Sequence, residues 1–164
     1  MTESAPQRAF VGLGANLGDP QAALSVALER IARLPGTRLV AQSRRYRSAP
    51  VEADGPDFFN AVAELQTTLE PLELLRELQA IEHHHGRQRP FVNAPRTLDL
   101  DLLLYADRVL ASDELTLPHP RMHRRAFVLL PLAELDPVIV APGLGLLADW
   151  ARRCSDQRIE VLPT

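Results

Sequence analysis

Two stretches of the chain repeat apolar residues at the spacing of an amphipathic helix. Residues 21–34 follow Asp19 and Pro20, a pair that can cap and start a helix. Residues 71–86 begin with a proline, which suits the first helical position, and end at a glycine. The apolar stripe of this second stretch consists of Leu74, Leu75, Leu78 and Ile81. The sequence therefore predicts two helices, each with one apolar and one polar side.

Shorter runs around these helices alternate apolar and polar residues, or are continuously apolar, as strands do. We expect strands at residues 9–13, 38–46, 58–67 and 95–105. Together with the two helices they give the order strand, helix, strand, strand, helix, strand. That order is typical of the split βαβ pattern, so we expect a ferredoxin-like α+β fold, in which helices lie on the faces of an antiparallel sheet.

The remainder of the chain has weaker patterns. A hairpin is expected around residues 111–114, and a helix over residues 123–134 that is interrupted at Pro131. A last short helix is expected over residues 146–153. We interpret these elements as a C-terminal hairpin and helical extension of a single domain that spans residues 1–164.

Two carboxylates interrupt the last of the predicted strands. In an extended chain Asp99 and Asp101 point the same way, with Cα atoms about 6.6 Å apart. Like charges this close repel one another, so a cation is their natural partner. Carboxylates favour hard ions such as Mg²⁺, and a pair can bridge two of them, as in phosphoryl-transfer sites. The opposite, apolar face of the strand is predicted to carry Leu98, Leu100, Leu102 and Leu104.

An Asp-x-Asp pair can also be a solvated strand face beside basic neighbours, and in an arbitrary sequence this is the commoner case. Here Pro95 restricts the backbone that leads into the strand, and Arg96 follows it directly. A cation and two anions are then held in one stiff frame. This arrangement favours a site for a metal-bound phosphate.

The composition narrows the classes of protein. With 164 residues and 46% hydrophobic content, the chain can bury the core of one domain. A net charge of -3 and the lack of a basic run argue against a protein that binds duplex nucleic acid. The sequence shows neither a membrane span nor a secretory signal, so we expect a cytoplasmic protein that acts as a monomer. The single cysteine, Cys154, is given no role.

The early glycines Gly12, Gly14 and Gly18 lack the spacing of a dinucleotide or phosphate loop, and we interpret them as turn residues. The consecutive histidines 83–85 point in different directions on a helix, which is more typical of a solvated helix end than of a metal site. A bound ATP would therefore have to be held through magnesium and arginines. The candidate arginines are Arg87, Arg89, Arg96 and Arg125.

Phe58, Asn60 and Phe127 form a second group of interest. Either phenylalanine can be an ordinary core residue. Asn60, however, shares a strand face with Phe58, and a side-chain amide beside an aromatic ring suits a flat heterocycle that is stacked and read at its edge. The spacing alone favours neither interpretation.

The motifs together resemble the 6-hydroxymethyl-7,8-dihydropterin pyrophosphokinases of folate biosynthesis, over nearly the whole chain. An Asp-x-Asp pair alone is a weak signal, whereas the ordered set is highly specific. The matching segments are residues 14–17 (GANL), 56–60 (PDFFN), 94–101 (APRTLDLD), 115–119 (LTLPH) and 125–127 (RAF).

The resemblance implies that the β,γ-diphosphate of ATP is transferred as one unit to the hydroxymethyl oxygen of the pterin, with release of AMP. It implies two Mg²⁺ ions, bound with ATP by Asp99 and Asp101, and it implies that Arg87 and Arg96 are catalytic. Pterin binding is implied for Ser48, Val51, Phe58, Asn60 and Phe127. ATP binding is implied for Gln79, Glu82, Arg87, Arg96, Leu102, Thr116, His119 and Arg125.

The chain departs from the family pattern at some positions. Phe58 stands where a tyrosine is common, so stacking is kept and a phenol hydrogen bond is lost. Glu114 replaces a common arginine and Pro120 a common tyrosine, so nucleotide contacts there are expected to be rearranged. We also expect the loops 47–57 and 87–94 to close over the substrates.

Two other functions are compatible with parts of the pattern. The Asp-x-Asp pair could be the metal clamp of a nucleotide-sugar transferase, although such enzymes need a larger α/β domain. A small ferredoxin-like module could also bind a nucleotide or a pterin for regulation, without catalysis. Formation of AMP from ATP only in the presence of the pterin would separate the first hypothesis from both.

Overall fold

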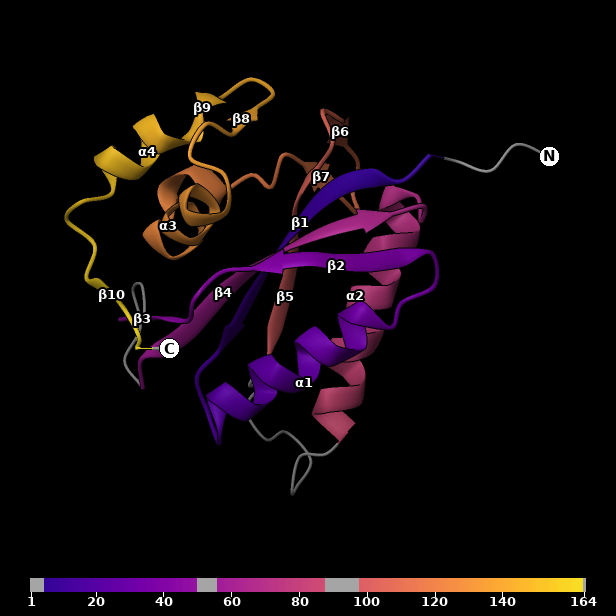
Figure 1. Cartoon of the computed structure of the whole chain (residues 1–164), viewed down its shortest axis with the longest axis horizontal. Coiled ribbons are helices and arrows are strands. Elements are labelled where there is room, and N and C mark those ends of the chain that lie inside the picture. Colours follow the sequence, from indigo (N-terminus) through magenta and orange to yellow (C-terminus); the bar gives the residue numbers. More distant parts are fainter. Residues whose placement is uncertain (1–4, 50–55, 88–97, 164) are drawn as a thin grey trace.

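The computed structural model describes residues 5–49, 56–87 and 98–163 (Figure 1). The strands of its main sheet are β1 (Gln7–Ala15), β2 (Thr37–Gln42), β3 (Tyr46–Ser48), β4 (Phe58–Thr67), β5 (Asp99–Tyr105) and β10 (Ile159–Val161). The helices are α1 (Pro20–Ala32), α2 (Pro71–Arg87), α3 (Ala126–Leu135) and α4 (Leu147–Arg153), with a 3-10 turn η1 (Met122–Arg124). Two small hairpins pair β6 (Leu110–Ala111) with β7 (Thr116–Leu117), and β8 (Val140–Ala141) with β9 (Gly145–Leu146).

The main sheet runs in the order β10-β3-β4-β1-β5. β2 also pairs with β4, along its residues 63–67, whereas β3 pairs with its residues 58–60. All of its strand pairs are antiparallel. In the βαββαβ part of the chain, the third strand β4 lies beside the first strand β1, between it and β2. This is the ferredoxin-like arrangement, so the predicted fold class is confirmed.

Helices cover both faces of the sheet (Figure 1). Alternate residues of β1 explain why: Val11 and Leu13 pack in one buried cluster with α1 and α2, whereas Phe10 packs in a second cluster with α3 and α4. The Asp19 carboxylate accepts a hydrogen bond from the N–H of Ala22 at 3.1 Å and so caps α1, as predicted. Within the three described ranges, no helix combines the length and the apolarity needed to cross a membrane.

Leu104 lies on the opposite side of the sheet from the predicted one. Val11 pairs with Leu102 but Phe10 pairs with Leu104, so β5 has one extra residue, Leu103, at this point. The bulge reverses the alternation of side chains along β5. Leu103 and Leu104 therefore both join the second cluster, while Leu98, Leu100 and Leu102 lie in the first as predicted.

The predicted strand 38–46 is in fact two strands, because the chain leaves the ladder between β2 and β3. Ser43 makes the break possible: its hydroxyl accepts a hydrogen bond from the N–H of Val62 at 3.0 Å and donates one to the carbonyl of Arg44 at 2.8 Å. The N–H of Arg44 then turns to the Glu134 carboxylate on α3, at 2.9 Å. A side chain thus replaces a main-chain partner, which periodicity does not reveal.

The helix expected over residues 123–134 begins later, at Ala126, after the 3-10 turn η1. Pro131 lies inside α3 and does not interrupt it. A proline removes one helical hydrogen bond, yet this one is buried against the sheet along with Val128, Leu129 and Leu132. Tertiary packing therefore outweighs the local preference of proline. The last helix matches its prediction within one residue.

Glu134, near the end of α3, joins that helix to the sheet. Its Oε1 accepts a hydrogen bond from the Tyr46 hydroxyl at 2.6 Å, while Oε2 accepts from the N–H of Arg44. Burial alone would raise the pKa of Glu134, but the hydrogen bonds from Tyr46 and Arg44 lower the pKa below its ordinary value. Burial and the same carboxylate raise the pKa of Tyr46 to about 12.

Tyr46→Phe is expected to lower the free energy of unfolding at neutral pH by about 1.5 to 3 kcal/mol, because the charged Glu134 carboxylate loses the hydrogen bond that the Tyr46 hydroxyl donates. The pKa of Glu134 is lowered in the fold, so this stabilisation is present above the ordinary carboxyl pKa and is lost as the pH falls through the lowered pKa. Urea unfolding between neutral pH and about pH 3 should show the two proteins converging in acid.

Tyr105→Phe is the matched control for this prediction. The Tyr105 hydroxyl donates to the carbonyl of Leu69 at 2.5 Å, and a carbonyl does not titrate. Removal of the Tyr105 hydroxyl should therefore lower the free energy of unfolding by the same amount at every pH. A Tyr46→Phe effect that is equally independent of pH would contradict the assignment of the Glu134 stabilisation to its charged form.

Candidate active site

A cleft with a volume of about 760 Å³ opens on the face of the sheet that α1 and α2 do not cover, beside the start of α3. Most of its lining comes from four strands, from the turn η1 and from the start of α3. β1 contributes Gly12 and Gly14, β4 contributes Phe58 and Asn60, and β5 and α3 contribute the charged and aromatic residues described below. These parts of the chain are distant in sequence and meet only in the fold.

The floor of the cleft consists of glycines in the central strand β1. Gly14 pairs with Asn60 of β4 on one side and with Asp99 of β5 on the other, and Gly12 likewise pairs with Asp101. The interpretation of these two glycines as turn residues was therefore wrong, because both lie inside a strand. Only Gly18 lies in a turn, with a φ of 70°. Two strand spacings separate Asn60 from Asp99, about 10 Å between Cα atoms, with no side chain between them.

The β4 wall presents a fixed amide. Asn60 is 3% exposed, and its Oδ1 accepts a hydrogen bond from the hydroxyl of Ser48 at 2.8 Å. In this orientation the amide oxygen is turned to Ser48, which leaves the Nδ2 hydrogens as donors. Nδ2 lies over the glycine floor, since a Cβ built on Gly14 would be only 3.2 Å from it. Phe58, two residues earlier, lines the same side of the cleft.

The β5 wall presents the two carboxylates. Asp99 and Asp101 both line the cleft, as the alternation of the strand requires. Between them, the N–H of Leu100 donates to Oε2 of Glu82 on α2 at 2.8 Å, which fixes this part of β5 against the helix. Glu82 was predicted to bind ATP; in the structure it holds the strand that carries the two aspartates.

The donor set fits magnesium. The described residues contain no group of three or more histidine, cysteine, aspartate or glutamate side chains that could enclose a metal ion. Mg²⁺ is usually held by one or two carboxylates and completes its shell with water and substrate phosphates. A pair of aspartates on one strand face beside an open cleft has this character.

The third wall is the start of α3. The Arg125 guanidinium lies 5.4 Å from the centre of the Phe127 ring and 3.9 Å from the Asp101 carboxylate. Arg121 and Arg124 line the same cleft. These cations face the carboxylates, so the cleft offers both signs of charge to a metal-bound anion. Sequence reasoning missed Arg121 and Arg124, although the three arginines within residues 121–125 (RMHRR) were a signal for them.

His119 lies between the hairpin β6–β7 and η1. The main-chain N–H of His119 donates to the carbonyl of Leu103 at 2.9 Å. The ring Nδ1 accepts from the main-chain N–H of Arg121 at 3.2 Å. Burial lowers the pKa of His119 below its ordinary value; the Asp101 carboxylate opposes this, and Arg125 and Arg121 add to it. Because Nδ1 accepts a hydrogen bond, the neutral ring carries its proton on Nε2.

The structure brings together in the cleft seven of the residues that the sequence singled out. They are Ser48, Phe58, Asn60, Asp99, Asp101, Arg125 and Phe127. Of the other predicted ATP residues, Gln79 is exposed on α2, Thr116 is exposed in β7, and the Leu102 side chain is buried in the core.

Of the three remaining predicted residues, only Arg87 belongs to the described part of the chain. Arg87 is the last residue of α2, and Val51 and Arg96 lie outside the described residues, as does Arg89. The loops 47–57 and 87–94, which were expected to close over the substrates, also lie mostly outside the described residues.

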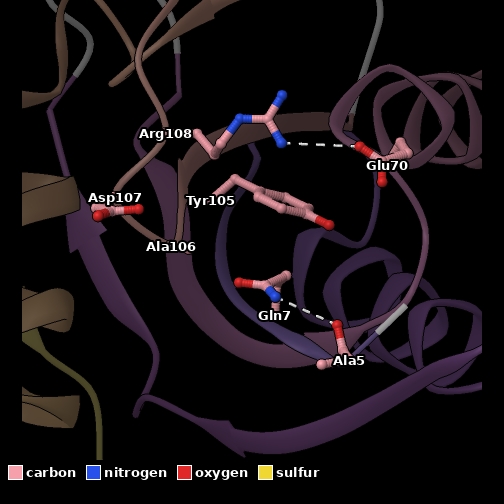
Figure 2. Close-up of a pocket in the computed structure, with 7 residues that line it drawn as sticks. All are labelled: Ala5, Gln7, Glu70, Tyr105, Ala106, Asp107 and Arg108. Atoms are coloured by element: carbon pink, nitrogen blue, oxygen red, sulfur yellow. Dashed lines mark hydrogen bonds and ion pairs between the residues drawn. The ribbon is translucent and has the colours of Figure 1, made fainter. Parts of the chain in front are cut away.

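A second pocket, of about 410 Å³, lies at the opposite end of β1 and β5 (Figure 2). Arg108 and Glu70 form an ion pair across it at 3.7 Å, and Gln7 donates to the carbonyl of Ala5 at 3.3 Å. It contains none of the residues that the sequence singled out. The residues that the sequence singled out gather instead in the cleft over the glycine floor, which is therefore the candidate active site.

Comparisons with known proteins identify the family of the chain. A curated protein of Pseudomonas aeruginosa named 2-amino-4-hydroxy-6-hydroxymethyldihydropteridine pyrophosphokinase is 48% identical over 158 residues, 96% of this chain and 98% of that protein. A Haemophilus influenzae protein of the same name is 41% identical over 152 residues, 92% and 95% of the two chains.

A solved structure, Plasmodium falciparum HPPK-DHPS wild type with STZ-DHP, matches with a TM-score of 0.77 over 93% of this chain. It is only 14% identical, and this chain spans 44% of its length, so it supports the fold alone. Residues 10–137 match the model of one family, 7,8-dihydro-6-hydroxymethylpterin-pyrophosphokinase. The resemblance noted from the motifs is confirmed: the chain belongs to the 7,8-dihydro-6-hydroxymethylpterin-pyrophosphokinase family.

Proposed function

We propose that this chain transfers diphosphate from ATP to 6-hydroxymethyl-7,8-dihydropterin in folate biosynthesis. The hydroxymethyl oxygen forms a bond to the β-phosphorus, the bond from that phosphorus to the AMP oxygen breaks, and the hydroxyl proton is released. The observation that carries the proposal is the cleft, in which an aromatic and amide wall faces two carboxylates about 10 Å away across a floor without side chains.

The pterin would lie on the β4 side, between Phe58 and Phe127. The Asn60 amide is buried, and its oxygen is used by Ser48, so its N–H donors are directed at acceptors on the edge of the ring. A rigid donor beside two apolar rings selects a flat heterocycle better than a flexible side chain would. Ser48 thus acts through Asn60, and Val51 is proposed to contact the same ligand.

ATP would lie on the β5 side. Asp99 and Asp101 would hold two Mg²⁺ ions, which neutralise triphosphate charge when bound. Arg125 is already paired with Asp101 at 3.9 Å and is placed to reach an anion at that position. The neutral His119 would donate from Nε2 to the nucleotide. We further propose Gln79, Glu82, Leu102 and Thr116 for ATP binding, and Arg87 and Arg96 for stabilising charge during transfer.

The decisive experiment is to measure AMP formation from ATP with and without 6-hydroxymethyl-7,8-dihydropterin. We expect AMP and pterin diphosphate in equal amounts, only when both substrates and Mg²⁺ are present. AMP formation that does not require the pterin, or binding of both ligands without turnover, would contradict the proposal. Binding of a UDP-sugar in place of ATP would instead support a nucleotide-sugar transferase.

Phe127→Ala is expected to raise the KM for the pterin by about tenfold to a hundredfold, because one stacking face and its buried area are lost. The KM for ATP should change much less. Phe127→Leu keeps apolar area without a ring and should fall between the two. Steady-state kinetics with each substrate varied in turn checks this, and an equal increase in both KM values would argue against stacking.

We also propose that residues 1–164 act as one pyrophosphokinase domain, as a monomer, in the cytoplasm where ATP is available. Both buried clusters share the strand β1, so the two faces of the sheet belong to one cooperative unit.

A further inference from the structure

Gln157 makes two hydrogen bonds to the turn that leads into α3. Its side-chain Oε1 accepts from the N–H of Ala126 at 2.9 Å, and its Nε2 donates to the carbonyl of Arg124 at 2.7 Å. These two main-chain groups stand on either side of Arg125. The orientation of the amide follows from chemistry, because an N–H needs an acceptor and a carbonyl needs a donor.

On its own segment Arg125 makes main-chain hydrogen bonds: its main-chain N–H donates to the carbonyl of Met122 at 3.3 Å, and its carbonyl accepts from the N–H groups of Val128 and Leu129, each at 3.0 Å. It is extended, with φ -121° and ψ 108°, and it precedes α3 without a side-chain cap. Its guanidinium reaches Asp101, and Phe127 is the second residue of the helix that follows. The direction of both side chains therefore depends on how this one extended residue joins η1 to α3.

Gln157 is itself held in place. The main-chain N–H of Gln157 donates to the carbonyl of Cys154 at 3.0 Å, in the turn after α4. The strand β10 begins two residues after Gln157 and pairs with β3. Gln157 lines the cleft, yet both of its amide groups are used by the main chain. It also lies outside residues 10–137, the part of the chain that matches the family model.

We infer that Gln157 is a positioning residue for the proposed reaction: its amide clamps the main chain around Arg125 and so fixes Arg125 and Phe127 toward the substrates. The inference rests on the proposed function, since it assigns Phe127 to the pterin and Arg125 to the nucleotide. A displacement of about 1 Å in a group that positions a substrate can lower the rate by up to about a hundredfold. The clamp thus contributes to the site without touching a ligand.

Gln157→Met keeps the length of the side chain and removes both hydrogen bonds. We expect a KM for the pterin about tenfold higher, with a smaller change in kcat, and faster hydrogen exchange at the amide of Ala126 in the free protein. Glu160→Gln, three residues further on, removes only an exposed ion pair with Arg47 and should leave the KM and the Ala126 exchange as they are.

Gln157→Glu separates a positioning role from a merely structural one. At neutral pH its carboxylate can accept from Ala126 but repels the Arg124 carbonyl, whereas a protonated carboxyl both accepts and donates. The pterin KM of this variant, divided by that of the wild type at the same pH, should therefore fall toward one as the pH is lowered to about 5.

The outcomes distinguish this inference from the proposed function. If the wild type forms no AMP, the proposed function fails, and the exchange of Ala126 still tests the clamp. If the wild type is active and Gln157→Met has an unchanged KM, or if the ratio for Gln157→Glu does not vary with pH, the positioning role of Gln157 is overturned.

Discussion

Replacing Asp101 with asparagine is expected to lower kcat/KM for AMP formation by about a thousandfold, the effect of losing about 4 kcal/mol of charge stabilisation in the transition state. Asp99→Asn should have a similar effect, because the two side chains share one face of β5 and line the same cleft. Asparagine keeps the size of the side chain and removes the charge, so the fold should be preserved. AMP release and circular dichroism measure the two effects separately.

Asp107→Asn is the matched control. Asp107 is exposed just beyond the other end of β5, where it lines the second pocket and not the cleft (Figure 2). Its replacement should leave turnover unchanged, and removal of Mg²⁺ with a chelator should reduce the wild type to the level of Asp101→Asn. Near-normal turnover by either Asp99→Asn or Asp101→Asn would refute the metal assignment.

Gly14→Val is expected to lower kcat/KM by at least about a hundredfold, with a folded protein. A Cβ at this position would be 3.2 Å from Nδ2 of Asn60, and the two methyl groups of valine would enter the floor between Asn60 and Asp99. Gly14 does not have a positive φ, and valine favours strands, so the backbone itself accepts the change. Both substrates should bind more weakly.

A graded series tests the steric argument. Gly14→Ala adds the Cβ alone, which asks Asn60 to move by a few tenths of an ångström, and should have a smaller effect, mainly on the pterin. Kinetics and thermal unfolding of the glycine, alanine and valine proteins should show activity falling in that order while the melting temperature changes little. Equal activity of all three would show that the floor need not be open.

Local patterns predicted the elements that carry the site. The strand 58–67 was predicted with the bounds that β4 has, and the alternation around Asp99 and Asp101 predicted their common face. These predictions succeeded because period-two and period-3.6 patterns record which face of an element is buried. The shared strand face of Phe58 and Asn60 followed from the same reasoning.

Features that depend on register between distant strands could not be predicted. The role of Gly12 and Gly14 as a floor exists only because β1 lies between β4 and β5, and the reversal at Leu104 comes from a bulge against Phe10. The hydrogen bonds of Gln157 join residues about thirty positions apart and leave no periodic trace. Sequence patterns report local burial, whereas these contacts are set by topology.

The strand β5 lies at one edge of the sheet. Two residues that we propose for nucleotide binding make hydrogen bonds to the main chain of this edge strand. Glu82 accepts from the N–H of Leu100, and the N–H of His119 donates to the carbonyl of Leu103. Unpaired strand edges promote edge-to-edge association between copies of a protein. Substitutions of Glu82 therefore carry a risk of aggregation, and loss of soluble protein in such variants would report an opened sheet edge rather than weaker ATP binding.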